Sequence, residues 1–382
     1  NHTFENDPSG HTHTFTNLEN PDVRLRAKDD PVSFLNQLKT PSVIDEIQYV
    51  PELLSYIKTK IDEHRIPGQW IVTDSQNFAL MKDVAQSLAG RVAVLSLLPF
   101  SVSERTSNAF NAKSTTDWLK RLKEPFKNNP RLPKIPPVEE LLSRGFYPEI
   151  SSNKQVVGQL WCGSYVSTYL ERDVRNLANI GDLNQFERFL IACAIRTGQI
   201  INLSEIARDI GISAPTAKRW LSVLETGHQV YLLYPYYRNI GKRIIKSPKI
   251  YFNDPAICSY LLGLHNAEAI LKSPNFGNLF ETMIVSDFLK RFLHFGEKPS
   301  MYYIRSRDNL EIDLVVENLG KLNLFEIKSS MTITPKHALN LNRISNDLLG
   351  LVETKSIISR TEDNFVVTKD ITNYSWKKIL TT

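Results

Sequence analysis

Residues 301–316, MYYIRSRDNLEIDLVV, and residues 322–330, LNLFEIKSS, decide the expected fold of the C-terminal part of this chain. Apolar and aromatic residues alternate over the first segment, and the second is a short apolar run into an acidic-x-basic triplet. Both segments are therefore expected to form β-strands. The intervening residues, ENLGK, contain Asn and Gly and predict a hairpin. That hairpin would place Asp313 beside Glu326, with Lys328 on the same strand face as Glu326.

These side chains have the chemistry of a site for a hard divalent cation. The neighbouring carboxylates of Asp313 and Glu326 can bind Mg²⁺ or Mn²⁺ through oxygen. Lys328 could position or activate a water molecule, or hold a phosphate. Upstream, the segment GNLFETMIVSDFLKRFL has apolar residues at helical spacing and carries Glu281. The alternative interpretation is that Glu326 and Lys328 are only a solvated pair on an edge strand.

A helix Glu, a strand Asp and an ExK strand occur here in the order of the PD-(D/E)xK nuclease core, which this part of the chain resembles. An ExK triplet alone occurs in many proteins, so the order of the three parts carries the prediction. The resemblance implies a nuclease-like α/β domain over residues 266–382. It also implies that Glu281, Asp313 and Glu326 are metal ligands and that Lys328 is catalytic.

The composition is that of an ordinary soluble protein. The chain has 382 residues, enough for two or three domains, with 42% hydrophobic and 23% charged residues. No apolar run is long enough to span a membrane. The net charge of +5 permits nucleic-acid binding without requiring it. The three cysteines are widely spaced and form no CxxC pair, so they are expected to be small buried residues in a reducing cytoplasm.

The first third of the chain alternates strand and helix patterns. Residues 41–48, PSVIDEIQ, are a short apolar strand that ends in Asp45 and Glu46, and an amphipathic helix follows. This is the Walker B position of a P-loop ATPase, where the Asp holds Mg²⁺ and the Glu polarises the attacking water. An exposed strand end followed by a helix cap would explain the acidic pair alone equally well.

A second strand, QWIVTDSQN, ends in Ser75 and Gln76, where such ATPases place a polar sensor of the γ-phosphate. Residues 81–104, MKDVAQSLAGRVAVLSLLPFSVSE, then predict a helix with Arg91 at its end and a further strand. The segment TFTNLENPDVR, residues 14–24, is interpreted as a strand that precedes all of these.

The runs DEIQYVPELL, TDSQN and SLAGRVAVLSLLPFS resemble prokaryotic AAA-family ATP-binding proteins, which pair an ATPase domain with a C-terminal domain of unknown function 4143. The similarity covers most of residues 14–330. It implies an AAA-type ATPase domain over residues 1–105, with ATP and Mg²⁺ as cofactors. The residues that it implies for nucleotide binding are Asp45, Ser75, Gln76 and Arg91, with Glu46 as the catalytic residue.

Two features depart from that family. The Gly-rich GxxxxGK[ST] loop, whose amides and Lys cradle the phosphates, does not occur in the sequence. The first strand and this loop are expected upstream of Asn1, and a degenerate ATPase domain is the alternative. Asp74 stands where the family commonly has Gly, and its carboxylate beside Ser75 would repel a γ-phosphate.

The middle of the chain predicts a linker and a winged helix. Residues 106–160 contain a basic, proline-containing stretch that is expected to be a linker or lid. Residues 161–265 are expected to form a helical and winged-helix domain. Within it, LSEIARDIGISAPTAKRWLSVLE predicts a helix–turn–helix with its turn at Gly211 and with Trp220 and Leu221 facing inward. HQVYLLYPYY and RIIKSPKIYF predict the two strands of a wing.

Basic residues of this module make DNA a candidate partner. They are Lys218 and Arg219 in the second helix and Lys242 and Arg243 in the wing. Contacts with phosphate groups are the most that these charges predict. Winged helices also serve as protein-packing modules, in which case these cations are only solvated.

The expected fold class is α/β, with an incomplete P-loop AAA-type ATPase domain, a winged helix-turn-helix and a PD-(D/E)xK nuclease-like domain. One hypothesis is a cytoplasmic ATPase coupled to a Mg²⁺-dependent nuclease-like domain that acts on DNA, without a membrane partner and with a homo-oligomer open. The other is a non-catalytic DNA- or protein-binding regulator with vestigial ATPase and nuclease sites. A toxin–antitoxin or phage-defence role is suggested by the architecture alone.

Overall fold

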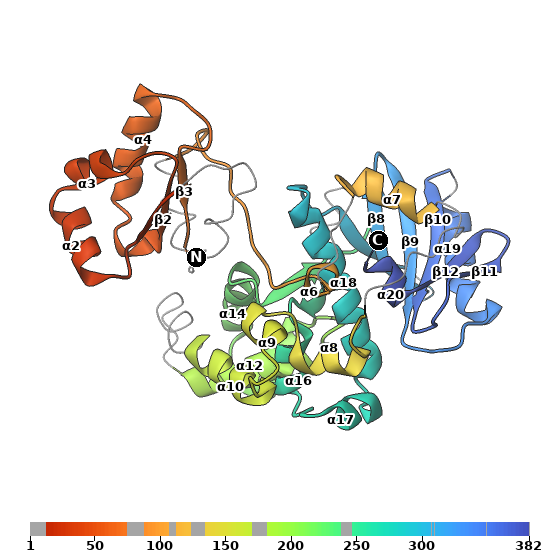
Figure 1. Cartoon of the computed structure of the whole chain (residues 1–382). Coiled ribbons are helices and arrows are strands. Elements are labelled where there is room, and N and C mark those ends of the chain that lie inside the picture. The colour runs from red at the N-terminus through yellow and green to blue at the C-terminus, as the bar shows by residue number, and fades with distance from the viewer. Residues whose placement is uncertain are drawn as a thin grey trace. The chain divides into compact units, whose positions relative to one another are not determined.

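The computed structural model describes residues 13–74, 88–106, 112–123, 134–169, 182–237 and 247–381, apart from residues 307, 309 and 349. The chain divides into two compact units, residues 1–94 and residues 95–382. Figure 1 shows the elements of each unit. None of the helices in the described part of the chain is long and apolar enough to cross a membrane.

The N-terminal unit is a small parallel sheet covered by helices. Its three strands lie in the order β1-β2-β3, with Asn17 opposite Asp45 and Ile44 opposite Val72. Asn20 caps the first helix by accepting from the N–H of Asp22, and a proline follows at the first helical position. The elements are β1 (Thr14–Asn17), α2 (Pro21–Asp29), α3 (Pro31–Gln37), β2 (Ser42–Asp45), η1 (Ile47–Tyr49), α4 (Leu53–Glu63) and β3 (Trp70–Val72).

The strand expected after Arg91 is wrong. Residues 92–98 belong to no helix or strand, and their apolar side chains are exposed, Val94 by 53% and Leu97 by 92%. A strand needs a neighbour to pair its backbone groups, and no described strand pairs with this segment. Most of the helix expected before Arg91 lies outside the described residues.

The larger unit is built around a mixed six-stranded sheet in the order β11-β12-β10-β9-β8-β7. The predicted hairpin joins β8 to β9, with Asn318 opposite Lys321. Leu319 and Gly320 both have positive φ, 50° and 75°, as a two-residue type I′ turn requires. The strands are β7 (Met301–Arg305), β8 (Glu311–Asn318), β9 (Lys321–Lys328), β10 (Val352–Ser359), β11 (Phe365–Thr368) and β12 (Ile371–Ser375).

The expectation of one strand over residues 301–316 is wrong, because this segment forms two antiparallel strands, β7 and β8. The chain turns between Ser306 and Leu310. Ser306 donates its N–H to the Leu310 carbonyl at 2.8 Å, and its hydroxyl accepts the Leu310 N–H at 3.1 Å. The polar run between the two alternating halves was the sign of this turn.

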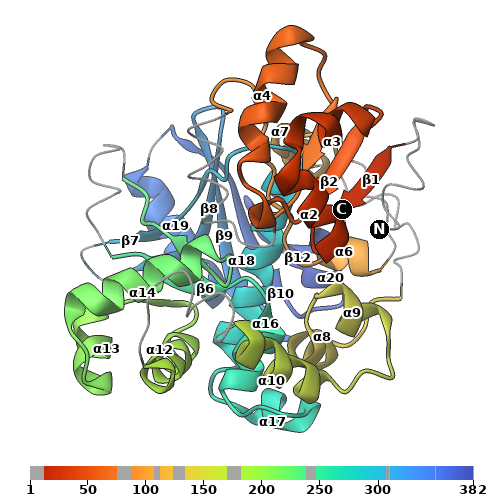
Figure 2. The same cartoon turned by 90° about the vertical axis from the view of Figure 1, so that its left-hand side faces the viewer.

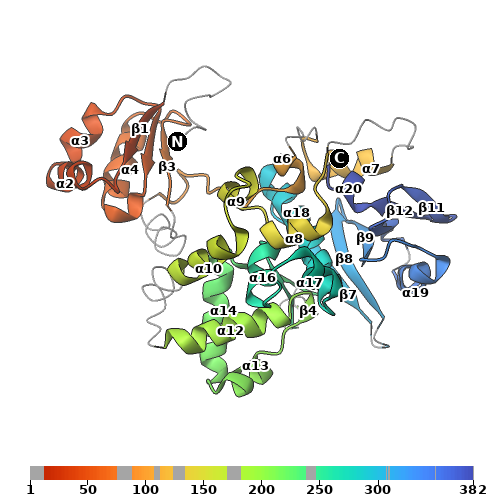
Figure 3. The ribbon, with the colours of Figure 1, turned by 60° about the horizontal axis from the view of Figure 1, so that its bottom comes forward.

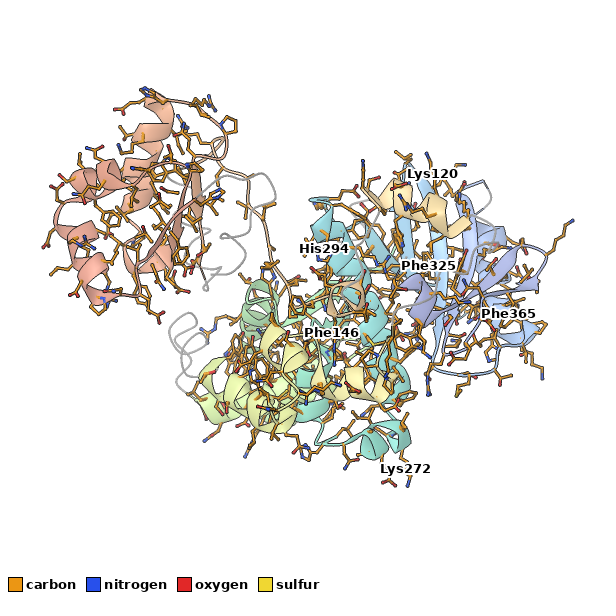
Figure 4. All side chains as sticks on the ribbon, in the orientation of Figure 1. Lys120, Phe146, Lys272, His294, Phe325 and Phe365 are labelled. Carbon is orange, nitrogen blue, oxygen red and sulfur yellow. The ribbon has the colours of Figure 1, made fainter. Side chains whose placement is uncertain are left out.

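Helices α18 (Phe276–His294) and α19 (Leu339–Asp347) cover opposite faces of the sheet (Figure 3). Phe325 of β9 packs against Phe288 of α18, with ring centroids 5.3 Å apart (Figure 4). Leu324, the neighbour of Phe325, belongs instead to the core formed with α19. This alternation follows from the two-residue period of a strand.

Helix α7 (Thr115–Lys123) lies within the segment expected to be a linker or lid, and it packs against the sheet domain instead. Trp118 is buried 4.8 Å from the Phe288 ring, and the Tyr374 hydroxyl donates to the Leu122 carbonyl at 2.7 Å. The apolar face of this short helix therefore belongs to the hydrophobic core. Upstream, α6 (Val102–Arg105) is fixed by Asp287, which accepts from the Val102 N–H at 2.7 Å.

Helices and a small antiparallel sheet make up the middle of the chain (Figure 2). Gly211 turns the chain between α13 and α14 with φ of 79°, and Trp220 and Leu221 are buried as expected. The sheet has the order β4-β6-β5. The elements are α8 (Val138–Arg144), α9 (Pro148–Ser152), α10 (Gly158–Tyr169), α12 (Leu183–Ile195), β4 (Gln199–Ile200), α13 (Leu203–Ile210), α14 (Ala214–Thr226), β5 (Val230–Leu233), β6 (Lys249–Phe252), α16 (Pro255–Leu261) and α17 (Ala267–Lys272).

This middle part is continuous with the C-terminal sheet. Tyr303 of β7 donates its N–H to the Tyr234 carbonyl at 3.1 Å and accepts the N–H of Tyr236 at 2.7 Å. The segment after β5 therefore pairs with the edge strand of the large sheet. Residues 95–382 accordingly form one compact unit. The expected boundary between a middle domain and a C-terminal domain within it stays a prediction.

We expect Gly145→Ala to lower the free energy of unfolding by about 3 kcal/mol or more, because two costs add. Gly145 has φ of +66°, and a Cβ there would lie 2.1 Å from Oδ1 of Asp254. Asp254 is buried and accepts the backbone N–H groups of Phe146 at 2.7 Å and Ala256 at 2.8 Å. Denaturant unfolding measures the change.

Gly263→Ala is the control for a glycine with positive φ and no steric clash. Gly263 has a similar φ of +70° but no neighbour within 4 Å of the added Cβ. It is expected to cost only the backbone strain, about 1 kcal/mol. If both variants lose the same free energy of unfolding, the clash with Asp254 adds nothing to the cost of Gly145→Ala.

Candidate functional site

The acidic pair of the N-terminal unit lies at the carboxyl edge of its parallel sheet. Asp45 is the last residue of β2, and the Thr73 hydroxyl, directly after β3, donates to its carboxylate. Glu46 follows with a left-handed backbone, φ of 59° and ψ of 48°, which turns the chain out of the strand. Ligands of open α/β sheets bind outside the carboxyl ends of the strands. The pair therefore lies where a nucleotide phosphate is expected.

Of the other predicted nucleotide ligands, Arg91 is the one that the structure describes, and it is paired away from this edge. Ser75 and Gln76 lie outside the described residues. Arg91 forms a two-point ion pair with Asp62, Nε–Oδ1 2.6 Å and Nη2–Oδ2 3.0 Å. Asp62 is in the last turn of α4, which leads back to the start of β3 and hence to the opposite edge of the sheet. A nucleotide-binding role for Arg91 stays a prediction that this ion pair does not support.

A cavity of about 330 Å³ opens beside β1, α2 and α3. Its polar lining residues include Thr16, Asn17 and Arg26, and neither Asp45 nor Glu46 lines it. It is therefore not the predicted nucleotide site.

In the larger unit, the residues that opened the sequence analysis do come together. The register that places Leu314 opposite Phe325 brings Asp313 next to Glu326. Asp313 Oδ2 accepts the Ile327 N–H at 2.7 Å, and Lys328 Nζ lies 2.7 Å from Glu326 Oε1 and 4.0 Å from Asp313 Oδ2. The expected proximity of Asp313, Glu326 and Lys328 is confirmed.

Glu281 reaches the same place from α18, but its partners come from β6. Lys249 Nζ lies 3.1 Å from Glu281 Oε1, and the Tyr251 hydroxyl donates to the same oxygen at 2.5 Å. The Lys249 ammonium also lies 2.5 Å from Glu311 Oε1 and 3.9 Å from Asp313 Oδ1. We call Glu281, Glu311, Asp313 and Glu326 the carboxylate cluster.

Burial dominates the electrostatics of this cluster. It raises the pKa of Glu281 and of Glu326, and the nearby Asp313 carboxylate raises both further. Burial alone would lower the pKa of Lys249, but Glu281, Asp313 and Glu311 outweigh it and hold that pKa above its usual value. Burial raises the pKa of Tyr251, with Glu281 adding to the effect, so this hydroxyl stays a donor. The raised carboxyl pKa values agree with the repulsion expected among neighbouring acids.

The arrangement does not fit the predicted Mg²⁺ site. Across the described part of the chain, no group of three or more His, Cys, Asp or Glu residues is placed to hold a metal ion. Glu281 Oε1 already accepts from two donors, and Asp313 Oδ2 accepts a backbone N–H. Glu326 Oε2 is buried without a hydrogen-bond partner among the described residues, and one oxygen does not make a site. Metal binding by Glu281, Asp313 and Glu326 therefore stays a prediction without support from the geometry, and no reaction step at this cluster is assigned to a metal ion.

The sequence analysis missed three residues that take part in this network, Lys249, Tyr251 and Glu311. Two-residue spacing was the available signal, because Lys249 and Tyr251 share one face of the strand KIYF. Glu311 precedes Asp313 by the same spacing in EID. A lysine is rarely buried unless it has a charged partner. A single Lys in an otherwise apolar strand therefore indicated that β6 supplies a cation to buried acids.

The predicted DNA-binding residues are only partly described. Lys218 and Arg219 lie on α14, and both are exposed, whereas Lys242 and Arg243 lie outside the described residues. The buried face of α14 carries Trp220, which packs edge-on against Phe186 at 5.3 Å. The helix therefore presents its basic pair outward.

Comparisons with known proteins match three segments of the chain. Residues 2–106 match a family described as AAA domain, residues 136–268 a Domain of unknown function (DUF8612), and residues 276–379 a Domain of unknown function (DUF4143). The chain is 27% identical over 364 residues to the uncharacterized proteins Mb2031c of Mycobacterium bovis and Rv2008c of Mycobacterium tuberculosis. The alignments cover 95% of this chain and 74% of each relative. No solved structure matches.

We expect Glu326→Gln to change how stability depends on pH. A carboxyl group whose pKa is raised in the folded protein keeps a proton that the unfolded chain has released. The folded state therefore loses stability as the pH rises above 4.5, the ordinary value for Glu326. A glutamine side chain cannot ionise. Between pH 5 and about pH 8, the melting temperature of the variant should therefore rise relative to that of the wild type. Thermal unfolding across this range measures the difference.

If the melting temperatures of the wild type and Glu326→Gln depend on pH in the same way, the pKa of Glu326 is not raised. This outcome would mean that the ion pair with Lys328, at 2.7 Å, outweighs burial and keeps the carboxylate charged. Glu362→Gln is the control, because Glu362 is an exposed partner of Lys377 at 3.0 Å. It should leave the pH profile of the wild type unchanged.

Proposed function

Because the chain is an AAA-family protein with a C-terminal DUF4143 domain, we propose that its N-terminal unit binds and hydrolyses ATP with Asp45 and Glu46 at the reaction centre. The AAA domain indicates an ATPase. The residue roles, the use of Mg²⁺ and the action on DNA go further and are our proposals.

One observation carries the ATPase assignment, the position of Asp45 and Glu46 at the end of β2. The Asp45 carboxylate is oriented by the Thr73 hydroxyl from the next parallel strand, so it is held at the edge of the sheet. Glu46 leaves the strand with a left-handed backbone, and the Gln48 side chain donates to its carboxylate. These contacts hold the carboxylates of Asp45 and Glu46 in place next to each other, each with its own hydrogen-bond donor.

The donor set suits Mg-ATP. A bound Mg²⁺ would supply charge neutralisation for the transferred phosphoryl group, and hard carboxylate and hydroxyl oxygens are its usual ligands. Asp45 and Thr73 would hold the hydrated ion, and Glu46 would orient the attacking water and polarise its O–H bond.

For the middle of the chain, we propose a winged helix that contacts DNA phosphates. Support comes from the succession α13, α14, β5 and β6, and from the exposed pair Lys218 and Arg219 on α14. For the C-terminal domain, we propose kinship with the PD-(D/E)xK fold. The order of α18, β8 and β9 and the convergence of Glu281, Asp313 and Glu326 support it. We assign no cleavage to this domain, because its carboxylates are engaged by protein donors.

We expect Glu46→Gln to retain ATP binding and to lower the hydrolysis rate by several orders of magnitude. The substitution conserves shape but removes the charge that polarises the water. Calorimetry measures binding, and phosphate release under single-turnover conditions measures the chemical step. Glu63→Gln, on the exposed end of α4, is the matched control and should hydrolyse like the wild type. Hydrolysis at the wild-type rate in Glu46→Gln would reject the proposed role.

We expect the double substitution Lys218→Glu, Arg219→Glu to weaken binding to every duplex sequence alike. Each lost phosphate contact should reduce the slope of log K against log salt by about 0.9. Fluorescence anisotropy over a salt series measures the slope. Lys272→Glu, at an exposed position on α17 (Figure 4), is the control and should leave the slope unchanged. If the double variant keeps the wild-type slope, α14 does not contact DNA, and the module packs against protein.

A further inference from the structure

The centre of the carboxylate cluster is taken by an amino group of the chain itself. Lys249 Nζ lies within 4.0 Å of three carboxylates, at 2.5 Å from Glu311, 3.1 Å from Glu281 and 3.9 Å from Asp313. These acids come from α18 and β8, and the lysine comes from β6. We propose that the Lys249 ammonium is the resident cation of this cluster, in the place where the sequence predicts a divalent metal ion.

A metal ion and this ammonium exclude one another. Mg²⁺ needs ligand oxygens at about 2.1 Å in near-octahedral geometry. An ion shared by Glu281, Glu311 and Asp313 would have to lie among their oxygens, where Nζ already lies at 3.1 Å, 2.5 Å and 3.9 Å from them. Two cations so close repel strongly in a buried site. The Tyr251 hydroxyl, at 2.5 Å from Oε1, also occupies a lone pair that a metal would need.

Lys249 is fixed in this position by its strand. It is 2% exposed, and β6 is the middle strand of its sheet, with Lys249 opposite Ile200 on one side and Leu233 on the other. The ammonium can leave only by rotating a buried stem, because the main chain is paired on both sides. Its removal would also leave Glu281, Glu311 and Asp313 without their shared counter-charge.

This ion network gives a structural role to the contact between the helix–turn–helix region and the C-terminal sheet. Strand β6 supplies the Lys249 ammonium, and α18 and β8 supply the carboxylates of Glu281, Glu311 and Asp313, so the charges of the two regions offset one another. The ion network therefore joins the two regions and sets how they pack. This inference is independent of the proposed ATPase activity, which belongs to the other unit.

Thermal unfolding of the full chain without nucleotide, in EDTA or in millimolar MnCl₂, tests the proposal. In EDTA, Lys249→Met should lower the melting temperature by about 10 °C, because it leaves buried carboxylates unpaired. Lys272→Met, whose lysine side chain is 76% exposed, should change it by less than about 1 °C. Mn²⁺ should leave the wild type unchanged and restore several degrees to Lys249→Met, since the vacated position can then accept the ion. The double variant Lys249→Met, Asp313→Asn should not recover.

Two results would overturn the proposal. In the first, Mn²⁺ raises the melting temperature of the wild type and Asp313→Asn abolishes the rise, so that the ammonium yields to metal. In the second, Lys249→Met is as stable as the wild type in EDTA. Should Lys249→Met not fold, electron paramagnetic resonance of Mn²⁺ with the folded wild type decides. Absence of protein-bound Mn²⁺ supports the resident ammonium, and bound Mn²⁺ that Asp313→Asn removes refutes it.

Discussion

Taking an ammonium group out of water costs several kcal/mol, and at Lys249 that cost must be offset by the carboxylates around it. Glu281 and Glu311 lie within 3.1 Å of its Nζ, and they belong to α18 and β8 of the C-terminal sheet domain. The packing of β6 on α18 is therefore constrained by charge as well as by apolar contact. The same constraint decides the chemistry, since donors of the protein occupy oxygens that a metal site would need.

The two candidate sites of the chain differ in this respect. Asp45 ends a parallel strand and accepts from one neighbouring hydroxyl, so it retains the capacity to hold a hydrated ion. Glu281 is half-buried and accepts from two donors at one oxygen. Acidic side chains thus have different roles at the two sites. An acid at the open edge of a sheet can exchange ligands, whereas an acid enclosed by fixed donors stabilises the fold.

Local patterns in the sequence predicted local structure well. The ENLGK turn fixed the β8–β9 register because type I′ geometry depends on the two central residues alone, and Trp220 faced inward as its helical spacing required. The strand expected at residues 92–98 failed because a strand depends on a neighbour that the pattern does not show. Lys249 was missed because its partners lie 32 or more residues away in the chain. Helix α7 was hidden by its basic, proline-rich surroundings, although Trp118, Leu119 and Leu122 mark an apolar face.

The burial of α6 and α7 has a consequence for synthesis on the ribosome. Val102 is bound by Asp287, 185 positions later, and Leu122 is bound by Tyr374, 252 positions later. Trp118 packs on Phe288, so it lacks this surface until α18 has emerged. Such long-range closure is slow and leaves apolar side chains exposed to aggregation during translation. A nascent chain that stops before α18 would carry these helices without their buried contacts, and chaperones and proteases act on such surfaces.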